Sequence, residues 1–353
     1  MNIYLYPSPN KNSRFFDEFY SALLAKNDEQ IKVRILEPQS KLGRKLFFVV
    51  NRLGNHFSIF SRLIPIAINS LLKKDRGGVV HFTTQLAVQP CIKNRFIFTY
   101  HDVLHMQPQF TGRFFGRDVL VRIDCAYEKA DCIITVSEFS KKLLQLYYPL
   151  TKSIFVVPPP IVSEMQQKER LSPISKHILF VGSAHPRKNL IFFLESIAQL
   201  KELNLKVSVV CRLTGGAYYD SFSYLINKLG LDNVTIYENI STQELNELYA
   251  SASCFCFPTF AEGFGMPPVE AQMRGVPVIA SDIPVCHEVL GDSCLYFNPL
   301  SANDIADKIR IIVDDKNKEI RAALIEKGYE NIKNYDIDTV VNAQFEVYRK
   351  FLK

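Results

Sequence analysis

The sequence lacks the features that mark membrane-spanning and secreted proteins. Its longest mainly apolar stretch, residues 47–68, is interrupted by Asn51, Arg52 and Arg62. No segment therefore reaches the roughly 20 apolar residues that a membrane-spanning helix needs. The first residues, MNIYLYPSPN, also lack the basic, apolar and small-residue order of a signal peptide. We expect a cytoplasmic protein, associated at most peripherally with the inner face of the cytoplasmic membrane.

Metal-binding and dinucleotide-binding patterns are missing as well. The eight cysteines lie mostly in apolar runs such as CIITV and ASCFCF, where a thiol packs as a small hydrophobic group. Cys254 and Cys256 do not form a CxxC pair, and no histidine stands nearby at a ligand spacing. No GxGxxG follows any predicted strand, which argues against a nicotinamide-dependent enzyme. We expect reduced cysteines, no bound metal and no cofactor.

Charge is divided unevenly along the chain. Residues 1–160 contain 22 Lys and Arg against 12 Asp and Glu, whereas residues 161–353 contain 20 against 24. In the first half, residues 41–76 hold eight basic residues and one acidic residue, interleaved with Phe, Leu and Ile. This pattern fits an anionic membrane surface as partner and, equally, the solvated basic face of a helix. No nucleic-acid-binding module is present, so nucleic acid is not an expected partner.

Short apolar runs alternate with longer amphipathic segments, which is typical of βα units that build a parallel sheet. The predicted strands cover residues 2–6, 32–36, 79–82, 96–100, 132–136 and 154–158, and then 177–182, 206–211, 234–238, 253–258, 276–281 and 294–297. We predict an α/β protein with two doubly wound, Rossmann-like domains. Ligands of such sheets bind beyond the carboxyl ends of the strands, so we expect a cleft between the domains.

A proline-rich, polar segment without apolar periodicity, PPPIVSEMQQKERLSPIS, separates the two sets of strands. It predicts an exposed linker near 158–176, between a domain of residues 1–160 and a domain of residues 161–335. Residues 336–353 are expected to form a C-terminal helix that packs back on the first domain.

The segment SCFCFPTFAEGFGMPPVEAQMRGVPVIASD carries the clearest functional pattern. A strand ends near Pro258, a loop with glycines covers 261–266, and Pro267 suits the first turn of a helix. The loop N–H groups and the helix N-terminus favour an anionic or hydroxyl-rich ligand. Glu262 in the loop and Glu270 in the helix can accept hydrogen bonds from vicinal hydroxyls. Alternatively, the two carboxylates only cap the helix and complement its dipole.

A second segment, FVGSAHPRKNLIFFLESI, places two adjacent cations at a strand-to-helix turn. The strand ends at Gly182, the loop carries Arg187 and Lys188, and a helix begins at about Asn189. An arginine fork beside a lysine point charge can neutralise a diphosphate. A solvated basic turn is the alternative interpretation.

Two strand ends in the first half carry further polar candidates. RFIFTYHDVLH places His101 and Asp102 directly after a strand. The histidine is placed to bond a sugar or to orient an acceptor, with Asp102 fixing its tautomer. Alternatively, it only makes structural hydrogen bonds at the end of the strand. In TVSEFSKKLL, Ser137 is first of all a helix N-cap and secondarily an acceptor contact. In the second half, Glu288 in VCHEVLGD is a weaker candidate for a residue that faces the cleft.

These segments, together with TQELNELYASA before the strand predicted at 253–258, resemble the retaining glycosyltransferases of family 4. Glu262 and Glu270 match the E-x7-E signature of that family, and the likeness runs through most of the chain. It implies a GT-B fold. It also implies that Glu262, helped by the N–H groups of Gly263, Phe264 and Gly265, contacts the hydroxyls of the transferred sugar, while Glu270 holds the nucleotide ribose.

The resemblance further implies that Arg187 and Lys188 bind the donor diphosphate, that Gly182 borders the donor site, and that His101 takes part in catalysis. The acceptor hydroxyl then attacks the sugar on the face from which the phosphate departs, and the leaving phosphate takes its proton, without a metal. YHDVLH and VSEFS look most like bacterial polysaccharide mannosyltransferases. The implied donor is GDP-mannose, with UDP-sugars open, and the implied acceptor is a growing, lipid-linked surface glycan.

One departure from the family concerns the loop after the first strand. Family members usually carry glycines there, but this chain has PSPNKNSRFF. Either Asn and Ser replace glycine, or Lys11 and Arg14 supply charge on the acceptor side in place of backbone N–H groups. Two other functions stay open: a non-catalytic GT-B subunit that binds a glycan or a partner, and a sugar-phosphate phosphorylase.

Overall fold

The computed structural model describes residues 1–6, 14–26, 28–36, 63–102, 117–148, 152–161, 176–212 and 217–351. The chain forms two compact units, Met1–Val162 with Ile337–Lys353 (unit 1) and Ser163–Asp336 (unit 2). Most of the linker predicted near 158–176 lies outside the described residues, as do Lys11 and residues 41–62. Within the described ranges, no helix combines the length and the apolar character needed to cross a membrane.

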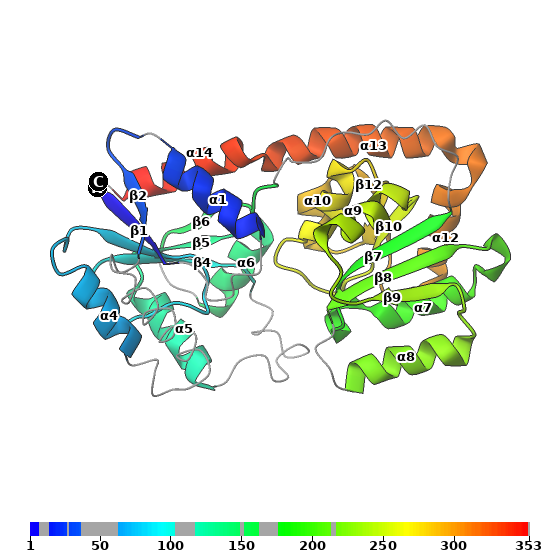
Figure 1. The fold of residues 1–353 in the computed structure, drawn as a ribbon, viewed down its shortest axis with the longest axis horizontal. Coiled ribbons are helices and arrows are strands. Elements are labelled where there is room, and N and C mark those ends of the chain that lie inside the picture. The colour runs from blue at the N-terminus through cyan, green and yellow to red at the C-terminus, as the bar shows by residue number, and fades with distance from the viewer. Residues whose placement is uncertain are drawn as a thin grey trace. The chain divides into compact units, whose positions relative to one another are not determined.

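Unit 1 contains a parallel sheet of six strands in the order β2–β1–β3–β4–β5–β6 (Figure 1). The strands are β1 (Asn2–Tyr6), β2 (Lys32–Ile35), β3 (Val79–Phe82), β4 (Phe96–Tyr100), β5 (Cys132–Thr135) and β6 (Ile154–Val156). Each coincides with a predicted strand. The inner strands are readable because both faces of a parallel sheet are buried, which favours apolar residues along the whole strand. The edge strand β2 differs, since its Lys32 and Arg34 are exposed.

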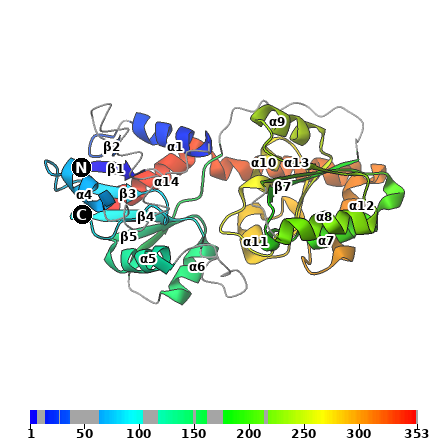
Figure 2. The ribbon, with the colours of Figure 1, turned by 60° about the horizontal axis from the view of Figure 1, so that its bottom comes forward.

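Alternate residues of these strands feed two separate cores. Ile3, Val79 and Ile97 pack with helices α1 (Arg14–Ala25) and α14 (Ile337–Lys350), whereas Val80 and Phe98 face the opposite core. That second core is covered by helices α4 (Leu63–Leu71), α5 (Arg117–Lys129) and α6 (Glu138–Tyr147). Figures 1 and 2 show α1 and α14 together on one face of the sheet and α5 on the other.

Unit 2 contains a second parallel sheet, with the order β12–β11–β10–β7–β8–β9. Its strands are β7 (His177–Ser183), β8 (Lys206–Arg212), β9 (Val234–Tyr237), β10 (Cys254–Phe257), β11 (Val278–Ser281) and β12 (Cys294–Phe297). These strands also coincide with the predicted ones, which confirms the α/β class. The order is that of a doubly wound dinucleotide-binding sheet, in which the chain grows outward in both directions from a central strand pair.

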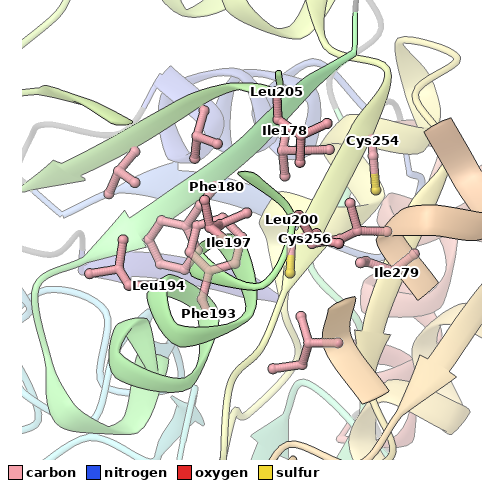
Figure 3. Packing of buried hydrophobic residues seen from close by; sticks show 14 of the residues in the cluster. Ile178, Phe180, Phe193, Leu194, Ile197, Leu200, Leu205, Cys254, Cys256 and Ile279 are labelled. Atoms are coloured by element: carbon pink, nitrogen blue, oxygen red, sulfur yellow. The ribbon is translucent and has the colours of Figure 1, made fainter. Parts of the chain in front are cut away.

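One face of this sheet is covered by α7 (Leu190–Ala198), α8 (Ala217–Leu229) and α12 (Ala302–Val313). Phe180, Phe193 and Ile197 meet in this core, as Figure 3 shows. Cys254 and Cys256 are buried among them as free thiols, in keeping with the predicted structural role. The remaining helices of the unit are α9 (Thr242–Ser251), α10 (Met266–Met273), α11 (Pro284–Leu290) and α13 (Lys318–Ile332).

Candidate functional site

The candidate site of unit 2 lies where the strand order of its sheet reverses. β7 and β10 pair side by side, but the chain continues from β7 to β8 on one side and from β10 to β11 on the other. At such a switch point a crevice opens at the carboxyl ends of the two strands. Arg187 and Lys188 follow β7, and Glu262 follows β10. The topology therefore brings the predicted cations and the predicted acid together.

Glu262 is the partner of both cations. Arg187 Nη1 lies 2.6 Å from Glu262 Oε1, and Lys188 Nζ donates to the same oxygen. Lys188 is 6% exposed and Glu262 is 7% exposed, so the pair is largely removed from water. Sequence reasoning assigned these residues to different parts of a ligand and missed that they bind each other. Lys188 and Glu262 are 74 positions apart, and no local pattern signals the contact.

The two cations keep Glu262 ionised. Burial is the largest single influence and raises the pKa of the carboxyl, but the charges and hydrogen bonds of Lys188 and Arg187 together outweigh it. The net result is a pKa below the usual 4.5. At neutral pH the site therefore holds two cations and one carboxylate.

Thr259 links the two loops of the site. Its hydroxyl lies 3.0 Å from Glu262 Oε1, 3.1 Å from the carbonyl oxygen of Ala261 and 3.0 Å from that of Arg187. The Phe260 N–H also donates to the Arg187 carbonyl, at 2.7 Å. These bonds tie the loop after β10 to the turn after β7. Thr259 was not among the predicted site residues, although its place three positions before Glu262 was visible in the sequence.

The cations stand on a single 3₁₀ turn, Pro186–Lys188, that is held at both ends. His185 caps the turn by accepting from the Arg187 N–H at 3.1 Å. Burial, followed by the charges of Arg187 and Lys188, lowers the pKa of His185 to about 4, so its ring is neutral and can accept. Asn189 follows the turn in the left-handed conformation, with φ 57° and ψ 40°.

Asn189 anchors this turn to the rest of the unit. Its side-chain amide donates to the carbonyl of Pro258 at 2.9 Å and to that of Pro299 at 2.8 Å, and the residue is 1% exposed. Sequence reasoning placed a helix start at about Asn189, which is confirmed because α7 begins at Leu190. Asn189 acts as an anchor through residues that are distant in sequence, so this role was not predicted.

Glu270 belongs to a separate cluster on α10. Tyr249 Oη donates to Glu270 Oε2 at 3.3 Å, and the Arg274 guanidinium lies 4.4 Å above the Tyr249 ring. Burial raises the pKa of Glu270, although the Arg274 charge and the Tyr249 hydroxyl act in the opposite direction. Pro267 and Pro268 in the first turn have no N–H, so the amide donors left at this helix end are those of Met266 and of the preceding loop.

The glycines and the aromatic residue of the predicted site have distinct local roles. Gly265 caps α10 with φ 99°, a conformation that side chains disfavour. The Phe264 ring is buried edge-on against Tyr335, with centroids 5.1 Å apart, so its side chain packs within the unit. At Gly182, a Cβ would lie 2.9 Å from the Phe180 ring. Gly263 lies in the buried loop beside Glu262.

His101 and Asp102 lie in unit 1, directly after β4. His101 Nε2 is 2.8 Å from the Thr83 carbonyl oxygen and therefore carries the proton, and the His101 N–H donates to Gln85 Oε1 at 3.1 Å. Burial lowers the pKa of His101, although the Thr83 bond and the Asp102 charge raise it, so the ring is neutral. The Thr83 carbonyl provides the bond that selects this tautomer. His101 also lines a small cavity with Gln344 of α14.

Ser137, Arg14 and Glu288 are the other predicted residues in the described parts of the two units. Ser137 is buried and caps α6 by accepting from the Ser140 N–H at 3.0 Å, which confirms the capping prediction. Arg14 begins α1, but its side chain lies outside the described residues. Glu288 is exposed on α11 of unit 2. In the described parts of both units, no group of three or more His, Cys, Asp and Glu residues is arranged to hold a metal ion.

Comparison with known proteins gives consistent matches. Residues 162–331 match the model of the family described as glycosyl transferases group 1. The O-antigen chain mannosyltransferase RfbU of Salmonella typhimurium is 30% identical over 321 residues, covering 85% of this chain and 84% of its own.

Two solved structures share the fold. Sucrose-phosphate synthase of Thermosynechococcus elongatus superposes with a TM-score of 0.75 and 18% identity, covering 100% of this chain and 99% of that one. HepE of Anabaena, solved in complex with UDP and glucose, gives a TM-score of 0.69 and 17% identity, with 99% of each chain covered. The predicted GT-B fold is therefore confirmed.

The Asn189 anchor can be tested by substitution. We expect Asn189→Ala to lower the free energy of unfolding by about 3 kcal/mol, because two buried carbonyls lose their donor and the left-handed backbone becomes strained. Asn204 is a matched control: it is exposed, has φ 49°, and makes no side-chain hydrogen bond within the described residues. Asn204→Ala should cost only about 1 kcal/mol. Equal losses in urea unfolding would show that the two carbonyl bonds contribute nothing.

Proposed function

This chain belongs to the group 1 glycosyltransferase family, and on that basis we propose that it transfers a hexose from a nucleotide sugar to a hydroxyl of a glycan, with retention of anomeric configuration. The observation that carries the proposal is the cluster of Arg187, Lys188 and Glu262 at the switch point of unit 2. This unit contains nearly all of the segment that matches the family. Two fixed cations there suit a diphosphate leaving group.

Arg187 and Lys188 stabilise the negative charge that grows on the leaving diphosphate. Both are held by contacts within the protein, Arg187 through the Ala261 carbonyl at 3.2 Å and Lys188 above the Phe257 ring at 5.4 Å. Preorganised charges of this kind lower a reaction barrier because they need no rearrangement as charge develops. They supply the stabilisation that a metal ion provides in other transferases, so we propose that the reaction needs no metal.

Glu262 contacts the hydroxyls of the transferred sugar. Its Oε1 is engaged by Arg187, Lys188 and Thr259, whereas Oε2 makes no hydrogen bond within the described residues. An ionised carboxylate oxygen accepts strongly from a sugar hydroxyl. The loop amides of Gly263, Phe264 and Gly265 lie next in the chain and complete this part of the donor site.

Glu270 binds the nucleotide ribose in the same proposal. The Tyr249 hydroxyl holds its Oε2, which directs Oε1 to the vicinal hydroxyls of a ribose. In unit 1, the neutral His101 contributes a polar ring to the sugar, with Asp102, Ser137 and Arg14 on the acceptor side. The leaving phosphate accepts the proton of the acceptor hydroxyl, so no further base is required.

The favoured donor is GDP-mannose. The relative RfbU is called an O-antigen chain mannosyltransferase, and the sequence motifs pointed to the same class. A UDP-sugar is the alternative, supported by the UDP bound to HepE. The favoured acceptor is a growing, lipid-linked glycan of the bacterial surface, made in the cytoplasm or at the inner face of its membrane.

The leaving-group assignment is tested with Lys188→Met, which removes the charge and retains the apolar stem. A thermal-shift screen with GDP, UDP, ADP and dTDP first identifies the nucleotide, because a bound ligand stabilises the fold by mass action. With the matching nucleotide sugar, Lys188→Met should lower turnover by roughly 10²–10³.

The exposed Lys318 provides a control that loses the same charge, as Lys318→Met. Turnover of Lys188→Met equal to that of the control would refute the assignment. If the wild-type chain binds a nucleoside diphosphate but neither hydrolyses nor transfers any sugar, the chain is a binding subunit and not an enzyme.

We also propose that residues 41–76 attach the chain to an anionic membrane surface. The described end of this segment supports it, since Lys73, Lys74 and Arg76 are exposed just after α4, which itself exposes Ile66. Replacing Lys41, Arg44 and Lys45 by Gln should weaken binding to vesicles with anionic lipids, and added salt should weaken wild-type binding in the same way. Vesicle binding that is unchanged both by the substitutions and by added salt would contradict the proposal.

A further inference from the structure

Three polar contacts of the Glu262 carboxylate converge on one of its oxygens. Arg187, Lys188 and Thr259 all approach Oε1. A carboxylate oxygen thus lies next to both cations of the proposed diphosphate site, and Glu262 serves as their counter-ion.

The surroundings make this pairing strong. Lys188 and Glu262 are nearly excluded from water, and the attraction between opposite charges rises as the effective dielectric constant falls. Separating such a pair leaves a buried charge without compensation, which is unfavourable unless another charge takes its place. A diphosphate brings that charge. Its binding to Arg187 and Lys188 therefore proceeds as an exchange of anions.

Thr259 permits the exchange without the loss of Glu262 from the site. Its single hydroxyl proton has three acceptors within 3.1 Å, the carbonyls of Arg187 and Ala261 and the Glu262 Oε1. While two cations saturate Oε1, the proton is available to a carbonyl. Once the cations turn to a diphosphate, the hydroxyl can rotate to hold the carboxylate, which remains in place for the sugar.

We propose that Glu262 competes with the diphosphate of the donor and of the product for Arg187 and Lys188. The inference rests on the proposed function and extends it: the acid that binds the sugar also weakens the hold on the diphosphate. After transfer, Glu262 recaptures both cations and so promotes release of the nucleoside diphosphate. Removal of this acid therefore strengthens diphosphate binding, although it damages transfer.

The test compares Glu262→Gln with the wild type by calorimetry, using inorganic pyrophosphate and the nucleoside diphosphate found in the screen. Loss of the competing charge should tighten the binding of both ligands about tenfold, the order of a single close charge pair. Glu319→Gln is the control, because Glu319 is exposed at the start of α13 and loses the same charge. Its affinities should equal those of the wild type.

Glu262→Gln should also melt at a lower temperature than the wild type, and pyrophosphate should raise its melting temperature by more than it raises that of the wild type. If the variant does not fold, Glu262→Asp retains the charge but withdraws it by one methylene, and it should show a smaller gain of the same sign. Equal or weaker pyrophosphate binding by the folded variant overturns the competition.

Different results would refute the competition by Glu262 and the nucleotide-sugar assignment. If the wild type binds a nucleoside diphosphate and Glu262→Gln gains no affinity, the competition is wrong and the donor site stands. If no nucleotide binds and no sugar is transferred, yet Glu262→Gln gains affinity for pyrophosphate, the competition stands and the nucleotide-sugar assignment is wrong.

Discussion

The reversal of strand order between β7 and β10 is the constraint on which the candidate site of unit 2 depends. Two neighbouring parallel strands send their chains to opposite sides of the sheet, so neither connection fills the space at their carboxyl ends. The turn with Arg187 and Lys188 and the loop with Glu262 meet in that space. Asn189 and Thr259 then fasten the two segments to each other.

The cluster of charges is better understood as a functional device than as a source of stability. A buried ion pair gains Coulomb energy but loses the hydration of both ions, and apolar replacements of such pairs are often neutral or stabilising. The hydrophobic core around Phe180 and Phe193 provides the folding energy of this unit. The ion pair instead holds two cations in fixed positions, and we propose that the anion of a ligand replaces Glu262 there.

The fold was predictable from the sequence to a large extent. In the part of the chain that the structure describes, all twelve strands coincide with predicted ones, and most are apolar because a parallel sheet covered on both faces admits few polar residues. Gly265, Pro267 and Pro268 likewise marked the start of α10, since glycine and proline leave local signals. Ser137 was recognisable as a cap for the same reason.

The site was predictable only in its residue types. Arg187, Lys188 and Glu262 stood out by their places after strands, but their mutual pairing depends on which strands are neighbours, and the spacing of residues does not encode this. The anchoring role of Asn189 was unpredictable for the same reason, since its two carbonyl acceptors belong to loops distant in sequence. On the acceptor side, Lys11 and most of residues 41–76 lie outside the described residues, and the expectations for them stay predictions.

The central claim is that the cations at the switch point receive the diphosphate of a nucleotide sugar. A crystal structure of the chain with its nucleoside diphosphate tests it most directly. We expect phosphate oxygens within hydrogen-bonding distance of Lys188 Nζ and the Arg187 guanidinium, with Glu262 Oε1 released from at least one cation and retained by Thr259. A phosphate bound elsewhere, with both ion pairs of Glu262 intact, would contradict it.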